Sequence, residues 1–246
     1  MTYTYVANSP LVGQITFAHG TTRMATTNHF DFLNRLQSVS NVPAADSTVS
    51  FNYQYNSANQ RTAVTNADNS FWLCQYDTLG QVISARKYWS DGTPVAGQQF
   101  TYGFDDIGNR TAAASGGDAS GNNLRSQSYT ADALNEYSSR ALPGYVSQLG
   151  WANPQAHVLT VADNGLWSDP PRKGGYFASE LAVNNAAALW LSVTNSAVLA
   201  GTTDFVSRVN GHVFVPPATE NIGYDADGNL TSDGRWNYTW DGESQA

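Results

Sequence analysis

The chain has 246 residues, a length that suits one large domain or two small ones with a buried core. Its 12 Lys and Arg residues stand against 20 Asp and Glu residues, which gives a formal net charge of −8. Nucleic acids and anionic membrane surfaces are bound through clustered basic side chains, so this balance predicts neither of them as a partner.

The choice of polar residues favours a β-rich fold. Of the 20 acidic residues 16 are Asp, only two residues are Lys, and the chain has 22 Asn and 21 Gly. Asp, Asn and Gly are typical of turns, whereas the exposed faces of helices are rich in Lys and Glu. With 7 Trp, 13 Tyr and 10 Phe residues as well, the composition predicts short strands joined by tight turns and excludes a mainly helical protein.

Targeting and redox features are sparse. Residues 1–6 carry neither a basic region nor an apolar stretch, so no signal peptide is predicted. The longest apolar run, Ala186 to Leu191, is too short to cross a bilayer, so no membrane insertion is predicted. Cys74 is the one cysteine, which excludes an internal disulfide and a zinc site built from thiolates.

A short motif recurs along the chain: an aromatic residue, then Asp or Asn, then two or three further residues and Gly or Asn. The anchors of the three clearest copies are Tyr76, Asp77 and Gly80, then Phe104, Asp105 and Gly108, and then Tyr224, Asp225 and Gly228. Weaker copies begin at Phe30, Tyr55, Tyr129 and Trp240, so successive copies are 25, 21, 28, 25, 95 and 16 residues apart. Four consecutive spacings in the twenties indicate a repeat architecture.

The residues before each motif alternate between aromatic and polar. Phe51, Tyr53 and Tyr55 share one face of an extended chain, with Asn52 and Gln54 on the other. The runs 72–76, 100–104 and 236–240 alternate in the same way. This period of two predicts half-buried strands that carry their aromatic side chains on one face.

The motif itself is typical of a turn. Asp at its second position can accept backbone hydrogen bonds, and Gly or Asn three residues later tolerates a positive φ. A type I turn that ends in a left-handed residue is a common hairpin connection, so each unit is predicted to be a β-hairpin. A single hairpin is marginally stable in water, so consecutive units are expected to pair edge to edge.

The copies at Phe104 and Tyr224 resemble the YD repeats of bacterial Rhs (rearrangement hotspot) proteins, also found in insecticidal toxin-complex components and teneurins. The resemblance covers about residues 1–140 and 219–246. It implies a long β-sheet ribbon that spirals into a hollow shell, which in bacterial members encloses a variable C-terminal toxin. It also implies further YD repeats of the parent chain and an enclosed C-terminal domain as partners, and a secreted or cell-surface bacterial protein.

The family differs from this chain in having many more repeats, followed by a self-cleavage motif. We therefore expect the sequence to be a piece of a longer protein or a truncated reading frame. The fold class that follows is mainly β: consecutive antiparallel hairpins of YD repeats in a curved open sheet, with an inserted small β-sandwich-like module.

The spacing of 95 residues locates that insertion and gives three segments, 1–139, 140–218 and 219–246. Residues 158–161 are predicted to be a strand followed by a turn at 163–165. Residues 206–215 are predicted to form a hairpin about Asn210-Gly211, because Asn-Gly suits a type I′ turn. Residues 186–193 fit either a buried strand or a short helix.

Several residues of the chain could have either a reactive or a structural role. Asp225, Asp227 and Asn229 resemble the first ligands of a calcium loop, but Leu230 stands where glycine is needed and Trp236 replaces the closing glutamate. A turn is the favoured interpretation. The four histidines lack metal or triad spacing, and no phosphate-binding or dinucleotide fingerprint occurs. No catalytic, cofactor-binding or metal site is predicted, and the chain is not expected to be an enzyme.

Two functions remain as hypotheses, with a glycosidase as a third that would need a cleft holding two carboxylates. The first is a non-catalytic structural segment of a shell that encloses a toxin or effector. The alternative is a carbohydrate- or cell-surface-binding module that uses exposed aromatic residues of the insert. Most Trp residues are predicted to pack in cross-strand ladders, whereas Trp151 and Trp167 lie beside Gly and Asp and are candidates for stacking on surface glycans.

Overall fold

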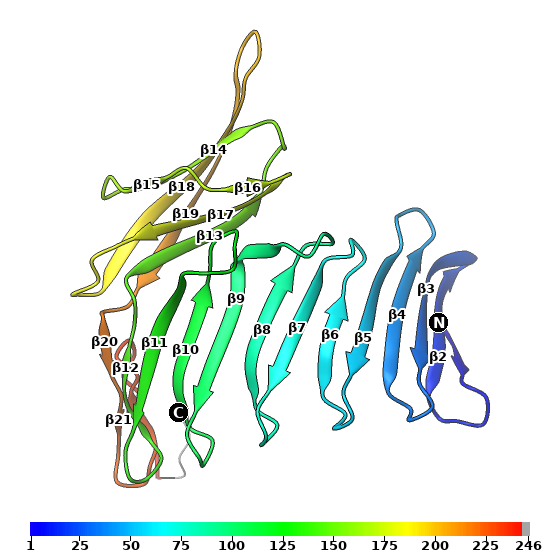
Figure 1. Cartoon of the computed structure of the whole chain (residues 1–246), viewed down its shortest axis with the longest axis horizontal. Coiled ribbons are helices and arrows are strands. Elements are labelled where there is room, and N and C mark those ends of the chain that lie inside the picture. The colour runs from blue at the N-terminus through cyan, green and yellow to red at the C-terminus, as the bar shows by residue number, and fades with distance from the viewer. Residues whose placement is uncertain (243–246) are drawn as a thin grey trace. The chain divides into compact units, whose positions relative to one another are not determined.

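The computed structural model describes residues 1–242, and its regular secondary structure in this range is β-strand throughout (Figure 1). The last four residues of the predicted third segment, 243–246, lie outside the described residues. Within 1–242, the structure offers no helix that is long and apolar enough to span a membrane.

The strands follow one another with short connections. Those before the insertion are β1 (Thr2–Tyr5), β2 (Val12–His19), β3 (Thr21–Phe30), β4 (Leu36–Pro43), β5 (Val49–Tyr55), β6 (Arg61–Thr65), β7 (Phe71–Tyr76), β8 (Val82–Tyr88), β9 (Pro94–Phe104), β10 (Arg110–Gly116), β11 (Leu124–Ala131) and β12 (Tyr137–Ala141). The rest are β13 (Tyr145–Trp151), β14 (His157–Ala162), β15 (Trp167–Ser168), β16 (Arg172–Lys173), β17 (Tyr176–Ala182), β18 (Leu189–Leu199), β19 (Phe205–Val215), β20 (Thr219–Asn221), β21 (Gly223–Tyr224) and β22 (Leu230–Ser232).

Thirteen strands form one antiparallel sheet in the order β1 to β12 and then β20, and the sheet is not closed. Neighbours in the sheet are therefore neighbours in sequence until the chain returns at β20. The prediction of consecutive antiparallel hairpins in an open sheet is confirmed. One repeat of the sequence spans two strands and two turns, which explains its length of 21 to 28 residues.

A β-bulge accompanies the motif in each hairpin. Tyr55 pairs with Arg61, and the register shifts between Gln54 and Tyr55. Tyr76 pairs with Val82 with the same shift beside it. The extra residue strengthens the local twist and lets a short turn join two strands of fixed register.

The chain divides into two compact units, residues 1–94 and 95–246. The boundary falls within the segment 1–139 that the repeat spacing treats as one sheet. The first unit holds β1 to β8, and most of its side chains are half-buried or exposed. The second unit holds the remaining strands, including all those of the insertion.

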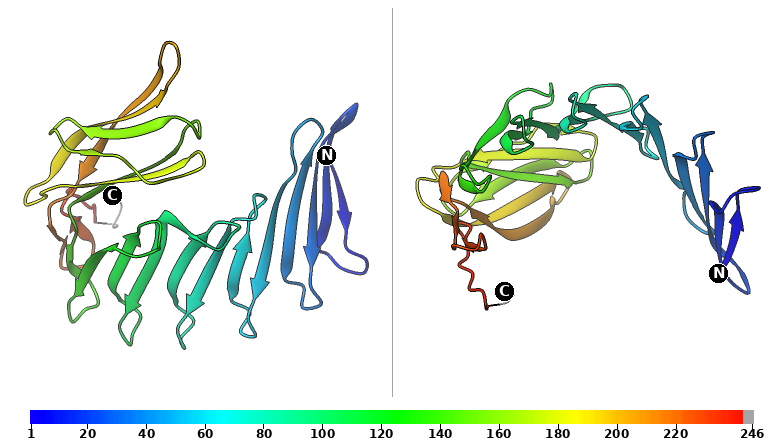
Figure 2. Two further views of the ribbon diagram at one scale, coloured as in Figure 1. Left: turned by 45° about the horizontal axis from the view of Figure 1, so that its top comes forward. Right: turned by 90° about the horizontal axis from the view of Figure 1, so that it is seen from below.

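The insertion in the second unit forms two small sheets, with strand orders β13-β17-β16 and β15-β14-β18-β19 (Figure 2). They enclose the main apolar core of this unit, made by Val146, Ala162, Leu181, Val183, Leu191, Val193 and Val215. Buried residues alternate with less buried ones along β14 and in the first half of β18, as expected for sheets packed on one face. The predicted sandwich-like module is confirmed.

The predicted hairpin about Asn210-Gly211 is wrong. Both residues lie inside β19, which pairs with β18 along its whole length, from Leu189 opposite Val215 to Leu199 opposite Phe205. The connecting turn is residues 200–204 instead. Eleven cross-strand pairs outweigh the local turn preference of one Asn-Gly step, and Gly211 has no positive φ.

Some of the other local predictions are confirmed and others are wrong. The strand at 158–161 and the turn after it are confirmed, because β14 ends at Ala162 and Gly165 has a φ of 86°. Of the ambiguous run 186–193, residues 189–193 form the start of β18, and residues 186–188 precede it without regular structure. The predicted strand at 236–240 is wrong, since that segment contributes only an isolated bridge between Ser232 and Asn237.

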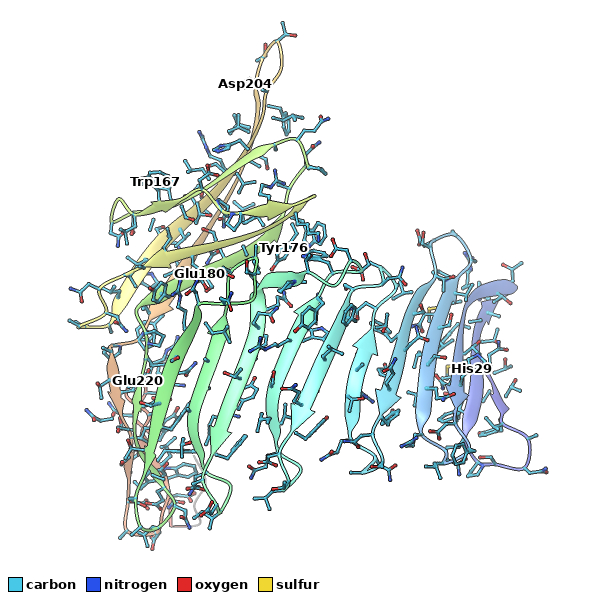
Figure 3. The ribbon with its side chains drawn as sticks, viewed as in Figure 1. His29, Trp167, Tyr176, Glu180, Asp204 and Glu220 are labelled. Atoms are coloured by element: carbon cyan, nitrogen blue, oxygen red, sulfur yellow. The ribbon has the colours of Figure 1, made fainter. Side chains whose placement is uncertain are left out.

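Side chains fasten the insertion to the repeat strands of the second unit. The Tyr176 hydroxyl donates to the carbonyl of Ala96 at 2.7 Å, and the Arg125 guanidinium binds Glu180 with an Nε–Oε2 distance of 3.0 Å (Figure 3). Where the chain rejoins the sheet, Arg140 binds the buried carboxylate of Glu220 at 2.9 Å from Nε. Two of these contacts thus bind the insert to β9 and β11, and the third joins β12 to β20 in the main sheet.

Candidate functional site

One hydrogen-bond pattern recurs in the turns of both units. The first residue of the turn is Asp or Asn, and its Oδ1 accepts the backbone N–H groups of the second and fourth residues after it. In the Asp77 turn these donors are Leu79 at 2.9 Å and Gln81 at 2.8 Å. Turns with both bonds begin at Asp31, Asn56, Asp77, Asp105, Asp118, Asp132 and Asp225.

The backbone of each turn closes around that side chain. The N–H of Asp77 donates to the carbonyl of Gln81 at 3.0 Å, and the N–H of Gly80 donates to the carbonyl of Asp77 at 3.2 Å. Gly80, Gly108 and Gly228 have φ values of 87°, 95° and 81°. Three residues with a left-handed last member form the loop, which matches a type I turn followed by a bulge.

Where the first residue of the turn is Asp, its own turn binds Oδ1 through backbone N–H groups, and in several turns a nearby side chain binds Oδ2. In Asp225, Oδ1 accepts from the backbone N–H groups of Asp227 and Asn229, and Oδ2 accepts from the side-chain amide of Asn229 at 3.1 Å. These bonds, led by the backbone N–H of Asn229, lower the pKa of the Asp225 carboxyl. The backbone N–H of Asn122 likewise lowers the pKa of Asp118.

The tyrosine anchors connect one repeat to the one before it. Tyr55 donates its hydroxyl to the carbonyl of Leu36 at 2.8 Å, and Tyr76 donates to the carbonyl of Arg61 at 2.8 Å. In both cases the acceptor is the first residue of the preceding repeat's return strand. Phe104 has no hydroxyl to donate.

Arginine side chains stack on the aromatic rows. The guanidinium of Arg35 lies 4.9 Å from the ring centre of Tyr55, and that of Arg61 lies 4.2 Å from the ring centre of Tyr53. In the second unit Arg110 lies 5.0 Å from the ring centre of Tyr102. Such cation–π contacts are worth about 0.5–1 kcal/mol at exposed sites and cover the aromatic surface with aliphatic stems.

One arginine also ties consecutive turns together. Arg35 binds Asp31 of its own turn with an Nε–Oδ2 distance of 2.7 Å. Its Nη1 donates to Oδ1 of Asn59 in the next turn at 2.9 Å. In the second unit the side-chain amides of Asn109 and Asn135 connect two turns at 3.4 Å.

The weak copy at Tyr129 is displaced from its predicted place. Its turn begins at Asp132, so the residue before the turn is Ala131 rather than Tyr129. Tyr137, on the return strand, supplies the hydroxyl instead and accepts the backbone N–H of Arg110 at 2.7 Å. Within residues 1–242 no group of three or more His, Cys, Asp or Glu side chains is placed to hold a metal ion.

The insert carries an uncharged groove between its two sheets. The groove has a volume of about 480 Å³, and its apolar lining includes Leu149, Trp151, Phe177, Leu199, Phe205 and Val209. At its base Asn195 donates from Nδ2 to Oε1 of Gln148 at 3.3 Å and accepts the Thr160 hydroxyl at 2.7 Å. Every polar lining side chain is neutral, so the groove suits neutral or apolar groups.

The two candidate glycan-stacking residues lie in different places. Trp151 ends β13, is 69 % exposed, borders the groove and contacts Tyr176 edge to face at 5.7 Å between ring centres. Trp167 lies on β15 opposite Val161, is 66 % exposed, and is not among the residues that line the groove (Figure 3). The structure therefore does not join them into one platform.

Several residues that stabilise the turns or line the groove were not predicted from the sequence. The arginines at the fourth or fifth position after a turn start, such as Arg35 and Arg61, form a pattern that the repeats themselves display. Asp118 makes the same turn without an aromatic anchor. Phe177 and Phe205 line the groove from strands far apart in sequence, and no local pattern indicates that they meet.

Comparisons with known proteins gave structural neighbours only. No family model matches the chain, and no curated protein matches its sequence. Solved structures that superpose on it include the crystal structure of TcdB2-TccC3-Cdc42, that of TcdB2-TccC3 without its hypervariable C-terminal region, and the Photorhabdus luminescens Tc holotoxin pore. The TM-scores are 0.45, 0.44 and 0.42, at 11%, 12% and 12% identity. Each match covers 94% of this chain but 12% of the other chain.

Proposed function

We propose that this chain is a non-catalytic segment of the wall of a YD-repeat shell. In the full-length protein the shell encloses a C-terminal toxin or effector, and that protein is secreted or displayed at a bacterial cell surface. Further repeats of the parent chain continue the sheet. The motif resemblance is one source of this proposal, and the geometry of the repeat turns is the other.

The observation that supports this proposal is that the Asp at the start of a repeat turn binds the backbone of that turn. Asp77, Asp105 and Asp225 each place Oδ1 on two backbone N–H groups. A general acid or base must instead reach a substrate with an oxygen free to exchange a proton. A wall needs the reverse: the same rigid corner at regular intervals, with strands whose edges accept the next repeat.

Electron microscopy of the longest polypeptide that contains this segment tests the proposal. We expect a continuous sheet around an internal space, with this segment as part of the surrounding wall. A second form of that polypeptide lacking one complete repeat, residues 77–104, is expected to expose the interior to protease. A compact particle without an internal space, or a segment that hangs apart from it, would contradict the shell.

Carbohydrate binding is a second candidate, and Trp151 favours it because its exposed ring borders an uncharged groove. Trp151→Ala and Trp167→Ala test the two rings separately in calorimetry against soluble polysaccharides. Binding that is lost in the Trp151 variant and kept in the Trp167 variant would support this candidate. If the unaltered chain binds none of the polysaccharides, carbohydrate binding is excluded and the shell-wall function is the one candidate that remains.

A further inference from the structure

One strand of the insert has a long unpaired edge. β19 is the last strand of its sheet, so among the described residues it pairs with β18 alone. Its first eight residues are exposed, and Phe205 and Val209 are 70 % and 67 % exposed. An exposed edge of this length, with apolar side chains, is a template for another strand.

The same edge borders the uncharged groove. Phe205, Ser207 and Val209 line it, and they share the face of β19 that carries Val213 and Val215 into the core. Ser207 is the small member of this row, so there is room above it between two larger side chains. A strand added to β19 would complete the open side of the groove.

The residues at this edge are self-complementary. Asp204 and Arg208 flank Val206 symmetrically: Arg208 lies on the face of β19 opposite the groove, and Asp204 is the last residue of the turn before β19. Oδ1 of Asp204 accepts the backbone N–H of Gly201 at 3.3 Å, which leaves Oδ2 for the contact with Arg208. Figure 3 shows Asp204 at the tip of the hairpin, away from the rest of the module. If two copies of this segment run antiparallel with Val206 opposite Val206, each Asp204 lies opposite an Arg208.

We propose that the partner of this edge is a second copy of the chain, paired antiparallel about a two-fold axis at Val206. The two four-stranded sheets then become one eight-stranded sheet with two Asp204–Arg208 ion pairs. On the inner face Phe205 of each copy lies opposite Ser207 of the other. The larger ring fills the space above the serine and covers the groove.

Charge complementarity favours the register with its axis at Val206 over the two registers next to it. An axis one residue later, at Ser207, places Arg208 across from Val206. Neither Asp204 nor Arg208 then lies across from a residue of opposite charge. An axis at Arg208 places the two guanidinium groups face to face, which is destabilising. The uncharged groove and the matched charges outside it favour a second copy over a charged ligand.

A charge-swap series tests the proposal. Sedimentation velocity of the whole chain, from about 10 µM to about 1 mM because a single strand edge makes a weak interface, gives the dimer dissociation constant. Arg208→Asp opposes Asp204 with a second acid, and we expect dimerisation at least tenfold weaker. The double variant Asp204→Arg, Arg208→Asp restores both ion pairs in reversed order, and we expect a constant within threefold of the original.

Arg23→Asp is the matched control, because it makes the same charge change at an exposed position of the first unit. It should leave the dissociation constant unchanged. A chain that stays monomeric over the whole range overturns the proposal, as does a dimer that Arg208→Asp does not weaken, since its contact then lies elsewhere, such as the edge of β1. Failure of the double variant to recover also overturns it, because the opposed pairs would not be in contact.

Discussion

At the scale of single residues, each repeat turn is stabilised by the Oδ1 atom of its first residue. Oδ1 of the first turn residue satisfies two backbone N–H groups that would otherwise face solvent or lack a partner. Asn56 makes the same two bonds, at 3.0 Å each, without a charge. The turn therefore depends on an acceptor at this position and not on an acid.

Substitution of Asp77 separates these two properties. Asp77→Asn keeps the acceptor, and we expect its free energy of unfolding to stay within about 0.5 kcal/mol of the original. Asp77→Ala removes two hydrogen bonds, and we expect a loss of about 1–2 kcal/mol. Chemical denaturation of both variants measures the difference, and equal losses would show that the charge itself stabilises the turn.

The lowered pKa values of Asp118 and Asp225 predict acid sensitivity. Both carboxyls are harder to protonate in the folded chain than in the unfolded chain, where the pKa is near 3.8. Their contribution is complete above that pH and is lost as the pH falls through the lower folded values. We expect the unfolding free energy to be flat near neutral pH and to fall below about pH 4.

Denaturant titrations at several pH values check this expectation. The double variant Asp118→Asn, Asp225→Asn keeps both acceptors and removes both titrating groups. Its stability should fall less steeply in acid than that of the original chain. The same slope in both proteins would mean that other carboxyls cause the acid loss.

The tyrosine hydroxyls are among the contacts that join neighbouring repeats. Tyr76→Phe removes the bond from its hydroxyl to the carbonyl of Arg61 and keeps the ring. We expect a loss of about 0.5–1.5 kcal/mol in denaturant unfolding. Tyr3→Phe is the control, because Tyr3 is exposed and its hydroxyl donates to Sδ of Met1, two residues away, at 3.6 Å, and not to another repeat. Equal stabilities of the two variants would contradict a role for the hydroxyl in joining repeats.

At the scale of elements, the insert depends on close packing at its junction with the repeat strands. Gly97 has a φ of +77°, and a Cβ placed there would lie 2.5 Å from Cδ2 of Leu149. Both strain and crowding therefore oppose any larger residue.

Alanine substitutions separate the two effects. Gly97→Ala should cost about 2–4 kcal/mol, Gly92→Ala about 1 kcal/mol, and Gly211→Ala almost nothing. The reason is that Gly92 has a positive φ with open space, whereas Gly211 has open space and an ordinary φ. Thermal unfolding of the three variants gives the order, and a neutral Gly97→Ala would mean that the junction is looser than the structure shows.

The sequence predicts the elements where local chemistry is decisive. Alternating aromatics and the Asp-to-Gly spacing predict the hairpins at Tyr76 and Phe104, because turn type and strand period are both local properties. The prediction is wrong at Asn210-Gly211, where pairing with β18 outweighs the turn preference. It is also wrong at 236–240, where the alternating aromatics lie beside β22 but form only one bridge with it.

At the scale of the whole molecule, the sheet order follows from sequence because each strand pairs with the next. The groove does not, since Trp151, Phe177 and Phe205 come together only through the packing of two sheets. The same holds for the return of the chain, where Arg140 meets Glu220 across a long insertion. Non-local contacts of this kind leave no periodic signal in the chain.

The acids of the repeats form the corners of the hairpins, and the wall function proposed for the chain depends on this role. Amide hydrogen exchange at Ile107 and Asn109, the two donors to Asp105, tests this most directly. We predict that both amides are protected in the original chain and in Asp105→Asn, and that Asp105→Ala loses protection at these two amides while the flanking strands keep theirs. Amides that exchange at the unprotected rate in the original chain, or that are unaffected by Asp105→Ala, would contradict the account.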